Sequence, residues 1–478
     1  MLTLPGWSVP LEKSFRGEPG RTTSPSLRRL AFEVLRKVGS GRFARISLER
    51  LFDSRSISEA DRALLSEMVF GVIRRRKTLD RLIECASGRR LANIEPQGRL
   101  LLHLGTYQLL FLSKVPPYAA VNETVNVAKS IGGSHLARFA NAVLRKVSNW
   151  RGTFSRDNRE STRTLPIEGD YSLLLPEDVF TDPGKDLLSY LSEAYSYPRW
   201  AVERWLRRFG KELTRTILRE GNLPRPVFLR TNTIRTSPEY LRSRLEQGGC
   251  EVGETPYPEV FRTQALSAEV RLLLAQGLLS VQDVTQYRAT RGLVLEKASG
   301  ERFLDLCSSP GGKTTQIAEA TQDRAEIVAV DRSKSRLKMV QENCQRLGIH
   351  SVQLLCSDAA RLPRKFFAAF DRVLLDAPCS NTGVLSRRPE ARWRLNSRFL
   401  RSLVVEQQRL FEAALRYARP GGLILYSTCS LEREENEERV EVLRRSHPER
   451  FDVVEQEIVL PGTLRGDGGF WTLMRKRS

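Results

Sequence analysis

The stretch LDLCSSPGGKTTQIAE, Leu304 to Glu319, has the pattern of a strand, a tight Gly-Gly turn and then a helix. Such a turn lets the backbone approach a ligand closely and points helix N–H groups at it. The stretch matches neither GxxxxGK[ST] nor GxGxxG, so it disfavours a phosphate or dinucleotide site. It therefore predicts a ligand loop between a strand and a helix that is not built for phosphate.

Strand-like and amphipathic helix-like segments alternate around this stretch, from about residue 281 onward. This alternation implies a mostly parallel sheet flanked by helices, so the ligand site is expected beyond the carboxyl ends of the strands. The expected strands are residues 301–307, 326–331, 351–358, 370–378 and 422–430.

Acidic residues close three of these strands: Asp331, Asp358 and Asp376. A single aspartate at such a point is often only a helix cap. Three on successive strands are harder to explain as caps alone, and Asp331 is placed to accept hydrogen bonds from ribose hydroxyls. The acids predict a ligand with a hydroxylated sugar and a base edge but no phosphate.

Two cysteines also lie at strand ends, Cys379 in Pro-Cys-Ser and Cys429 in Thr-Cys-Ser. Buried packing is the usual role of a free cysteine, and it is the role we expect for Cys344 and Cys356. A thiolate beside a nucleoside site can instead add to C6 of a pyrimidine and make C5 nucleophilic. The pair therefore favours catalysis, without distinguishing which cysteine attacks.

An acidic turn, Glu432 to Glu438, follows Cys429. Acidic residues are favourable in the first turn of a helix. We therefore expect this turn to be the capped start of a solvated helix rather than catalytic machinery.

The composition is that of a globular, strongly basic chain. Its 478 residues suggest about two to four domains, and the net charge is +21. Such charge favours a polyanion partner, although a solvated basic surface is the alternative. No apolar run reaches the roughly 18 residues of a membrane span, and no secretory signal is evident. The chain has seven cysteines and no Cys-x-x-Cys pair. This pattern indicates free thiols in a reducing compartment and no zinc site.

The periodicity changes along the chain and divides it into four parts. Helical spacing predicts an all-α domain at 24–150, in which the basic run Arg74 to Lys77 is either a solvated face or an RNA contact. Residues 151–189 lose periodicity and are expected to be a linker or long surface loop. A small α/β module is expected at 190–280 and the sheet domain at 281–478.

Four motifs occur in order: LDLCSSPGGKT, VAVD, DAPCSNTGVLSRRPEARW and YSTCSLEREEN. They resemble the motifs of the S-adenosylmethionine-dependent RNA cytosine-C5 methyltransferases, the NOL1/NOP2/Sun family. The N-terminal helical part, with LLHLGTYQLLFLSKVPPYAAVNETVNVAK, is similar to the NusB-like domain. The resemblance implies a multi-domain protein: an all-α NusB-like N-terminal domain, a small α/β RNA-binding module and a C-terminal Rossmann-like α/β methyltransferase domain.

The resemblance also implies a role for each motif residue. Asp331 corresponds to the ribose-binding acid, Asp358 to the adenine-side acid and Asp376 to an acid between cofactor and cytosine. Cys429 corresponds to the cysteine that bonds C6, and Cys379 to the one that assists product release. The methionine-side cofactor loop corresponds to Cys307, Ser308, Ser309, Pro310, Gly311, Gly312 and Lys313, with Ser308 and Ser309 where the family usually has alanines.

The sequence thus predicts transfer of a methyl group from S-adenosylmethionine to C5 of a cytidine in 16S, small-subunit ribosomal RNA. We expect a cytoplasmic monomer without metal or membrane association. A non-catalytic RNA-binding or antitermination-type protein with an inert cofactor fold is the first alternative. A nicotinamide-dependent oxidoreductase is the second, and the missing GxGxxG disfavours it.

Overall fold

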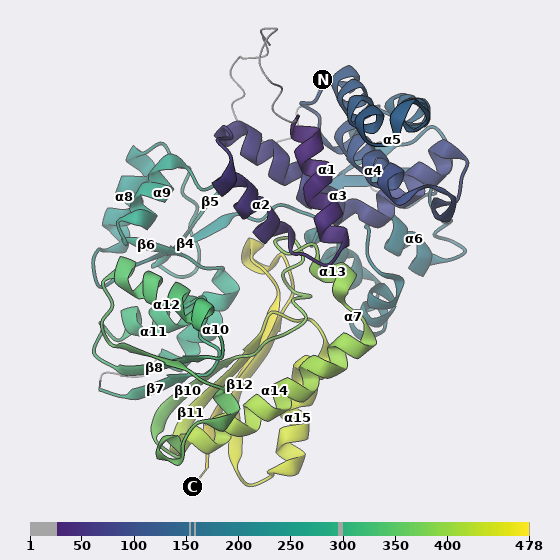
Figure 1. The fold of residues 1–478 in the computed structure, drawn as a ribbon. Coiled ribbons are helices and arrows are strands. Elements are labelled where there is room, and N and C mark those ends of the chain that lie inside the picture. Colours follow the sequence, from purple (N-terminus) through teal and green to yellow (C-terminus); the bar gives the residue numbers. More distant parts are fainter. Residues whose placement is uncertain (1–25, 153, 157–158, 295–299, 478) are drawn as a thin grey trace. The chain divides into compact units, whose positions relative to one another are not determined.

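The computed structural model describes residues 26–152, 154–156, 159–294 and 300–477. The chain forms two compact units, Met1–Leu223 and Pro224–Ser478, which are taken one at a time below (Figure 1). Residues 24 and 25, where we expected the helical domain to begin, lie outside the described part.

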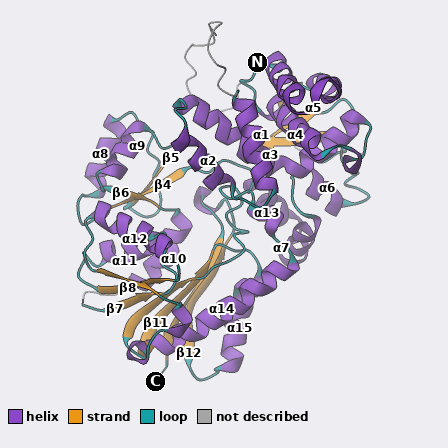
Figure 2. Ribbon diagram, in the orientation of Figure 1, coloured by secondary structure: helices purple, strands orange, loops and turns teal. Residues whose placement is uncertain are grey.

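The described residues from 26 to 148 fold into five α-helices, which confirms the helical prediction for this part of the first unit (Figure 2). Ser26 and Ser58 cap two of them through their hydroxyls, as N-cap serines do. Gly71 packs against the Tyr107 ring so closely that a Cβ would lie 2.0 Å from it. The helices are α1 (Leu27–Gly39), α2 (Ala44–Ser54), α3 (Glu59–Ser87), α4 (Pro96–Phe111) and α5 (Pro117–Ser148).

The segment 151–189 is not the irregular linker that its composition predicted. It contains a three-stranded antiparallel sheet in the order β1-β3-β2, because Leu165 and Leu173 pair across it and are buried in the unit. Two helices complete this unit. The elements are β1 (Phe154–Ser155), β2 (Thr164–Glu168), β3 (Tyr171–Leu174), α6 (Leu187–Ala194) and α7 (Arg199–Glu220).

Two residues of the basic run from Arg74 to Lys77 make contacts inside the first unit. Arg75 is 5% exposed and donates to the carbonyls of Pro166, at 3.1 Å, and Ile167. Lys77 donates through its backbone to Ser196 at 2.9 Å. These two members of the run hold the first unit together, so neither of the two roles expected for the run applies to them.

The second unit begins with a small module of three antiparallel strands in the order β5-β4-β6. Its apolar core includes Leu229, Leu241, Leu245 and Leu273, all fully buried. Its elements are β4 (Val227–Thr231), α8 (Pro238–Gln247), β5 (Val260–Thr263), α9 (Ala268–Ala275) and β6 (Leu279–Val281).

A seven-stranded sheet in the order β12-β13-β11-β10-β7-β8-β9 forms the rest of this unit. All five predicted strands are present, and their pairings are parallel. The two C-terminal strands were not predicted, and β13 runs antiparallel to both its neighbours. The strands are β7 (Arg302–Asp305), β8 (Glu326–Asp331), β9 (Val352–Cys356), β10 (Phe370–Asp376), β11 (Ala418–Thr428), β12 (Phe451–Val459) and β13 (Gly469–Lys476).

Helices cover both faces of this sheet, as Figure 1 shows. Successive strand residues such as Leu374 and Leu375 belong to two different hydrophobic cores, because successive side chains of a strand point to opposite faces of the sheet. One core is shared with α14 (Ser397–Tyr417) and α15 (Glu437–Ser446), and the other with α10 (Val284–Val294), α11 (Gly312–Ala320) and α12 (Lys334–Leu347). The strand ends are therefore the part of the sheet left for a ligand.

Candidate active site

The predicted ligand loop turns tightly between β7 and α11. Gly311 has φ +106°, and a Cβ there would lie 3.3 Å from Val340 Cα. Only glycine fits this position without strain. The hydroxyl of Ser308 donates to the Val330 carbonyl and that of Ser309 to the Arg336 carbonyl, at 3.1 and 3.0 Å. The two serines thus fasten the loop to β8 and α12.

Lys313, in the first turn of α11, joins the loop to the end of β10. Its Nζ lies 2.5 Å from Asp376 Oδ1 and 3.1 Å from Ser427 Oγ. Ser427, at the end of β11, donates to the same Oδ1 at 2.9 Å. Ser427 was not predicted, although a serine at the end of an apolar run is a signal that could have revealed it. The lysine is almost wholly buried, whereas the Asp376 side chain is 34% exposed.

Carboxylates crowd the neighbouring strand ends. Asp331 closes β8, is 4% exposed, accepts from the Ser333 backbone and pairs with Arg336 at 3.3 Å. Asp305 closes β7, and burial, with the nearby Asp376 charge, raises its pKa to about 7 against a hydrogen bond from Thr314. Burial and three of these acids also raise the pKa of the Cys307 thiol. The site therefore favours a ligand that brings positive charge.

Asp358 lies apart from that cluster. It stands two residues beyond β9, which ends at Cys356, so it does not close the strand as the sequence suggested. One carboxylate oxygen caps a short 3₁₀ turn and the other accepts from Arg409 at 2.8 Å. The Arg409 hydrogen bond lowers the pKa of Asp358. Asp358 is therefore a cap in this structure, and its adenine-side role stays a prediction.

The two strand-end cysteines are brought together. The backbone N–H of Cys429 donates to Cys379 Sγ at 3.3 Å, and the Gln286 amide donates to Cys429 Sγ at 3.4 Å. The side-chain hydrogen bond between the two thiols, together with burial, raises the pKa of the Cys379 thiol well above its ordinary value. Cys379 is therefore held as a neutral thiol beside Cys429. Gln286, in α10, was not predicted as a site residue.

The other cysteine and acid predictions give mixed results. Cys344 is buried in α12 as expected, but Cys356 is exposed and does not pack in the core. The acidic turn is not solvated either, because Glu432 is 1% and Glu435 0% exposed. The prediction of a solvated helix start was wrong for these two residues, and the Glu435 side chain accepts hydrogen bonds from the residues that follow the two cysteines. Helix α15 itself begins at Glu437.

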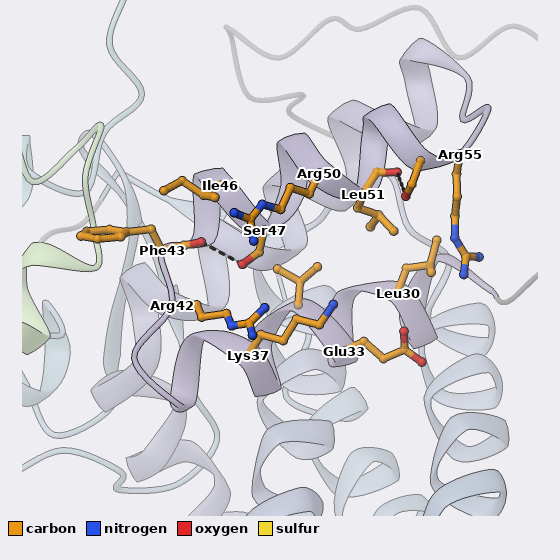
Figure 3. Close-up of a pocket in the computed structure, with 12 residues that line it drawn as sticks. Leu30, Glu33, Lys37, Arg42, Phe43, Ile46, Ser47, Arg50, Leu51 and Arg55 are labelled. Atoms are coloured by element: carbon orange, nitrogen blue, oxygen red, sulfur yellow. Dashed lines mark hydrogen bonds between the residues drawn. The ribbon is translucent and has the colours of Figure 1, made fainter. Parts of the chain in front are cut away.

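A separate hollow of about 500 Å³ lies between α1 and α2 in the first unit (Figure 3). Exposed cations surround it, and the Phe43 side chain beside them is 48% exposed. Glu33, its one acidic lining residue, already pairs with Arg29. The surface thus combines positive charge with an exposed ring. The four cations are Lys37, Arg42, Arg50 and Arg55.

The loop and acids fit S-adenosyl-L-methionine. Its sulfonium and ammonium are complementary to the carboxylates at the ends of β7, β8 and β10, and its own carboxylate to the N-terminus of α11. With the strand order above, these features define the class: an S-adenosyl-L-methionine-dependent methyltransferase. No described helix is long and apolar enough to cross a membrane.

Comparison with known proteins identifies the family. Residues 292–462 match the 16S rRNA methyltransferase RsmB/F model, 25–149 the NusB family and 197–264 the ferredoxin-like domain of RsmF/B-like methyltransferases. The chain is 32% identical to the probable ribosomal RNA small subunit methyltransferase B of Synechocystis, over 88% of this chain and 90% of that one. The chain belongs to the ribosomal RNA small subunit methyltransferase B family.

A second relative agrees with this assignment, and one solved structure shares the fold. The methyltransferase B of Klebsiella pneumoniae is 32% identical over 88% of this chain and 91% of its own. The crystal structure of PH0851 has the same fold, with a TM-score of 0.73 and 24% identity over 95% of this chain and 99% of that one.

Proposed function

We propose that the chain methylates C5 of a cytidine in 16S ribosomal RNA through a covalent bond between Cys429 and C6. The observation that carries this is a pair of contacts between the ends of β10 and β11. The Ser427 hydroxyl donates to Asp376 at 2.9 Å. Two residues later in the chain, the Cys429 N–H donates to Cys379 Sγ at 3.3 Å. Two thiols and an acid are thus held at neighbouring strand ends.

Cys429 is the nucleophile in this proposal. The family resemblance assigns the attack to Cys429. The side-chain hydrogen bond with Cys429 and burial raise the pKa of the Cys379 thiol, which agrees with this assignment because the thiolate is the reactive form. The Gln286 amide can stabilise negative charge on Cys429 Sγ by its hydrogen bond. Addition of the thiolate to C6 makes C5 electron-rich. When bound, S-adenosylmethionine would supply the electrophilic methyl group and leave as S-adenosylhomocysteine. Transfer of the C5 proton to a base and expulsion of Cys429 as the thiolate then restore the aromatic ring.

Asp376 would face the cytosine. Lys313 and Ser427 both contact its Oδ1, and among the described residues no group hydrogen-bonds Oδ2. That oxygen can therefore accept from the exocyclic amine of a cytosine, a donor that uracil lacks. The family resemblance supports this position between cofactor and base. Cofactor binding by the Cys307–Lys313 loop, Asp331 and Asp358 belongs to the same proposal.

Ribosomal RNA is the proposed partner because of charge and relatives. The net charge of +21 lowers the cost of approaching a phosphate backbone. The basic hollow of Figure 3 adds cations beside a ring on which a base can stack. The relatives' names indicate small-subunit ribosomal RNA. The target base would leave its stack to reach the strand ends, as enzymes acting on bases require.

A tritiated-methyl transfer assay with Cys429→Ala and Cys379→Ala tests the mechanism. Cys429→Ala should abolish transfer, because no thiol remains to activate C5. Cys379→Ala should accumulate a covalent RNA adduct that resists denaturation. Transfer retained by Cys429→Ala and lost in Cys379→Ala would reverse the two assignments. Absence of S-adenosylmethionine binding in calorimetry would instead favour a non-catalytic RNA-binding protein.

A further inference from the structure

Glu435 is a fully buried carboxylate that the mechanism above does not use. It lies in a 3₁₀ turn between β11 and α15 and is 0% exposed. Its Oε1 accepts from the Ser380 backbone N–H at 2.9 Å and from Gln407 Nε2 at 3.0 Å. Its Oε2 accepts from the hydroxyls of Ser380 and Ser430. Four donors therefore converge on one carboxylate.

These donors connect Glu435 to both cysteines. Ser380 directly follows Cys379, and Ser430 directly follows Cys429. The two serine hydroxyls also lie 3.0 Å apart. The same acid thus holds the residue after each thiol, at the point where the Cys429 N–H meets Cys379 Sγ. A small displacement of either serine moves one sulfur relative to the other.

The four hydrogen bonds favour the ionised form of Glu435. An ionised carboxylate only accepts hydrogen bonds, which matches four donors, whereas a protonated one loses an acceptor site and presents a donor to them. Burial raises the pKa of Glu435 against these hydrogen bonds. The titratable groups facing it are the Cys379 thiol and the Tyr426 phenol. The Arg439 cation and the Asp376 carboxylate also act electrostatically on that phenol. Acidification should therefore disconnect the two loops.

We propose that Glu435 is a positioning residue that fixes the spacing and orientation of the Cys379 and Cys429 thiols through Ser380 and Ser430. Its effect on methylation rests on the proposed function, but its effect on the thiols does not. None of the hydrogen bonds of Glu435 described above involves a residue of the Cys307–Lys313 loop. The affinity for S-adenosylmethionine should therefore not depend on Glu435.

The isosteric variant Glu435→Gln tests the proposal, with Glu441→Gln as control. Glu441 is a half-exposed acid of α15 whose nearest cation, Arg433, is 3.6 Å away. Glu435→Gln should lower the methyl-transfer rate by about 10- to 100-fold, the effect of losing charge-assisted hydrogen bonds, and leave the affinity for S-adenosylmethionine within about twofold. In the wild type, the methyl-transfer rate should fall at acidic pH as Glu435 is protonated. This fall should be smaller in Glu435→Gln and unchanged in Glu441→Gln.

Thiol labelling separates this proposal from the proposed function. In the full chain without RNA, iodoacetamide labelling read by mass spectrometry should show a changed ratio of Cys379 to Cys429 alkylation in Glu435→Gln, even if no RNA is methylated. Ser380→Ala with Ser430→Ala removes two donors with less risk to folding, and adding Glu435→Gln to that background should have a much smaller effect. An unchanged labelling ratio, full additivity, or a parallel loss of cofactor affinity would each overturn the positioning role.

Discussion

A buried ion pair links the small module to the helix after the cofactor loop, and breaking it should destabilise the second unit. Arg230 of β4 is 1% exposed. It binds both carboxylate oxygens of Glu319, at 2.7 and 2.8 Å. It also donates to Thr315 Oγ1 at 2.9 Å and to the Gly312 carbonyl at 2.7 Å. The substitution Arg230→Met keeps most of the side-chain volume and removes every one of these bonds.

The magnitude follows from what remains. Glu319 is 3% exposed and would lose its partner, and removing one member of a buried pair costs about 3–5 kcal/mol. Burial raises the pKa of Glu319, while Arg230 opposes that rise. Without Arg230 the pKa rises further. An acid with a raised folded pKa stabilises below its unfolded pKa, about 4.3, and loses that stability as pH rises through the folded pKa. The deficit should therefore be larger at pH 8 than at pH 5.

Urea unfolding of the full chain, with hydrogen exchange in α11 to assign the transition, measures this deficit. Arg242→Met is the matched control, because Arg242 pairs with Glu246 and Glu254 at the surface and should cost at most about 1 kcal/mol. Arg230→Met combined with Glu319→Leu should recover most of the loss, since no buried charge remains. A deficit for Arg230→Met below about 1 kcal/mol, or equal at both pH values, would refute the reasoning.

Three further outcomes are expected. Gly311→Ala should weaken S-adenosylmethionine binding in calorimetry by about tenfold or more, because the left-handed backbone strains an alanine there and its Cβ would press on Val340. Gly421→Ala is the control and should not weaken binding, since Gly421 also has a positive φ, +76°, but no atom lies within 4 Å of the added Cβ. Gln286→Leu should slow iodoacetamide labelling of Cys429 at neutral pH about 3- to 10-fold by removing a donor to the thiolate, with Cys379 as internal reference; equal rates would contradict this role. Lys37→Glu with Arg50→Glu should reduce the salt dependence of RNA binding, unlike Lys338→Glu on α12; an unchanged slope would exclude the hollow as an RNA contact.

Local pattern predicted the central sheet but not its C-terminal edge. The runs ending at Asp331 and Asp376 are continuous and apolar, the signature of parallel strands buried on both faces. Strand β12, FDVVEQEIV from Phe451, is mostly exposed and contains three acidic residues. Its sequence pattern therefore does not indicate a strand, and backbone pairing with β13 holds it in the sheet. The segment 151–189 was misjudged for a similar reason, because its strands are stabilised by Arg75, a residue distant in sequence.

The sequence by itself determined most of the chemical groups at the strand ends: the glycine turn, Asp331, Asp376 and the two cysteines are fixed by position along single segments, whereas Asp358 lies two residues beyond the end of β9. Only the tertiary structure decided which of them meet. The contact of Lys313 with Asp376 spans 63 residues of chain, from 313 to 376, and Glu435 reaches back 55 residues to Ser380. A glutamate in an acidic run reads as solvated because hydration of a charge is the default. Four converging donors replace that hydration, and they are assembled only when the sheet forms.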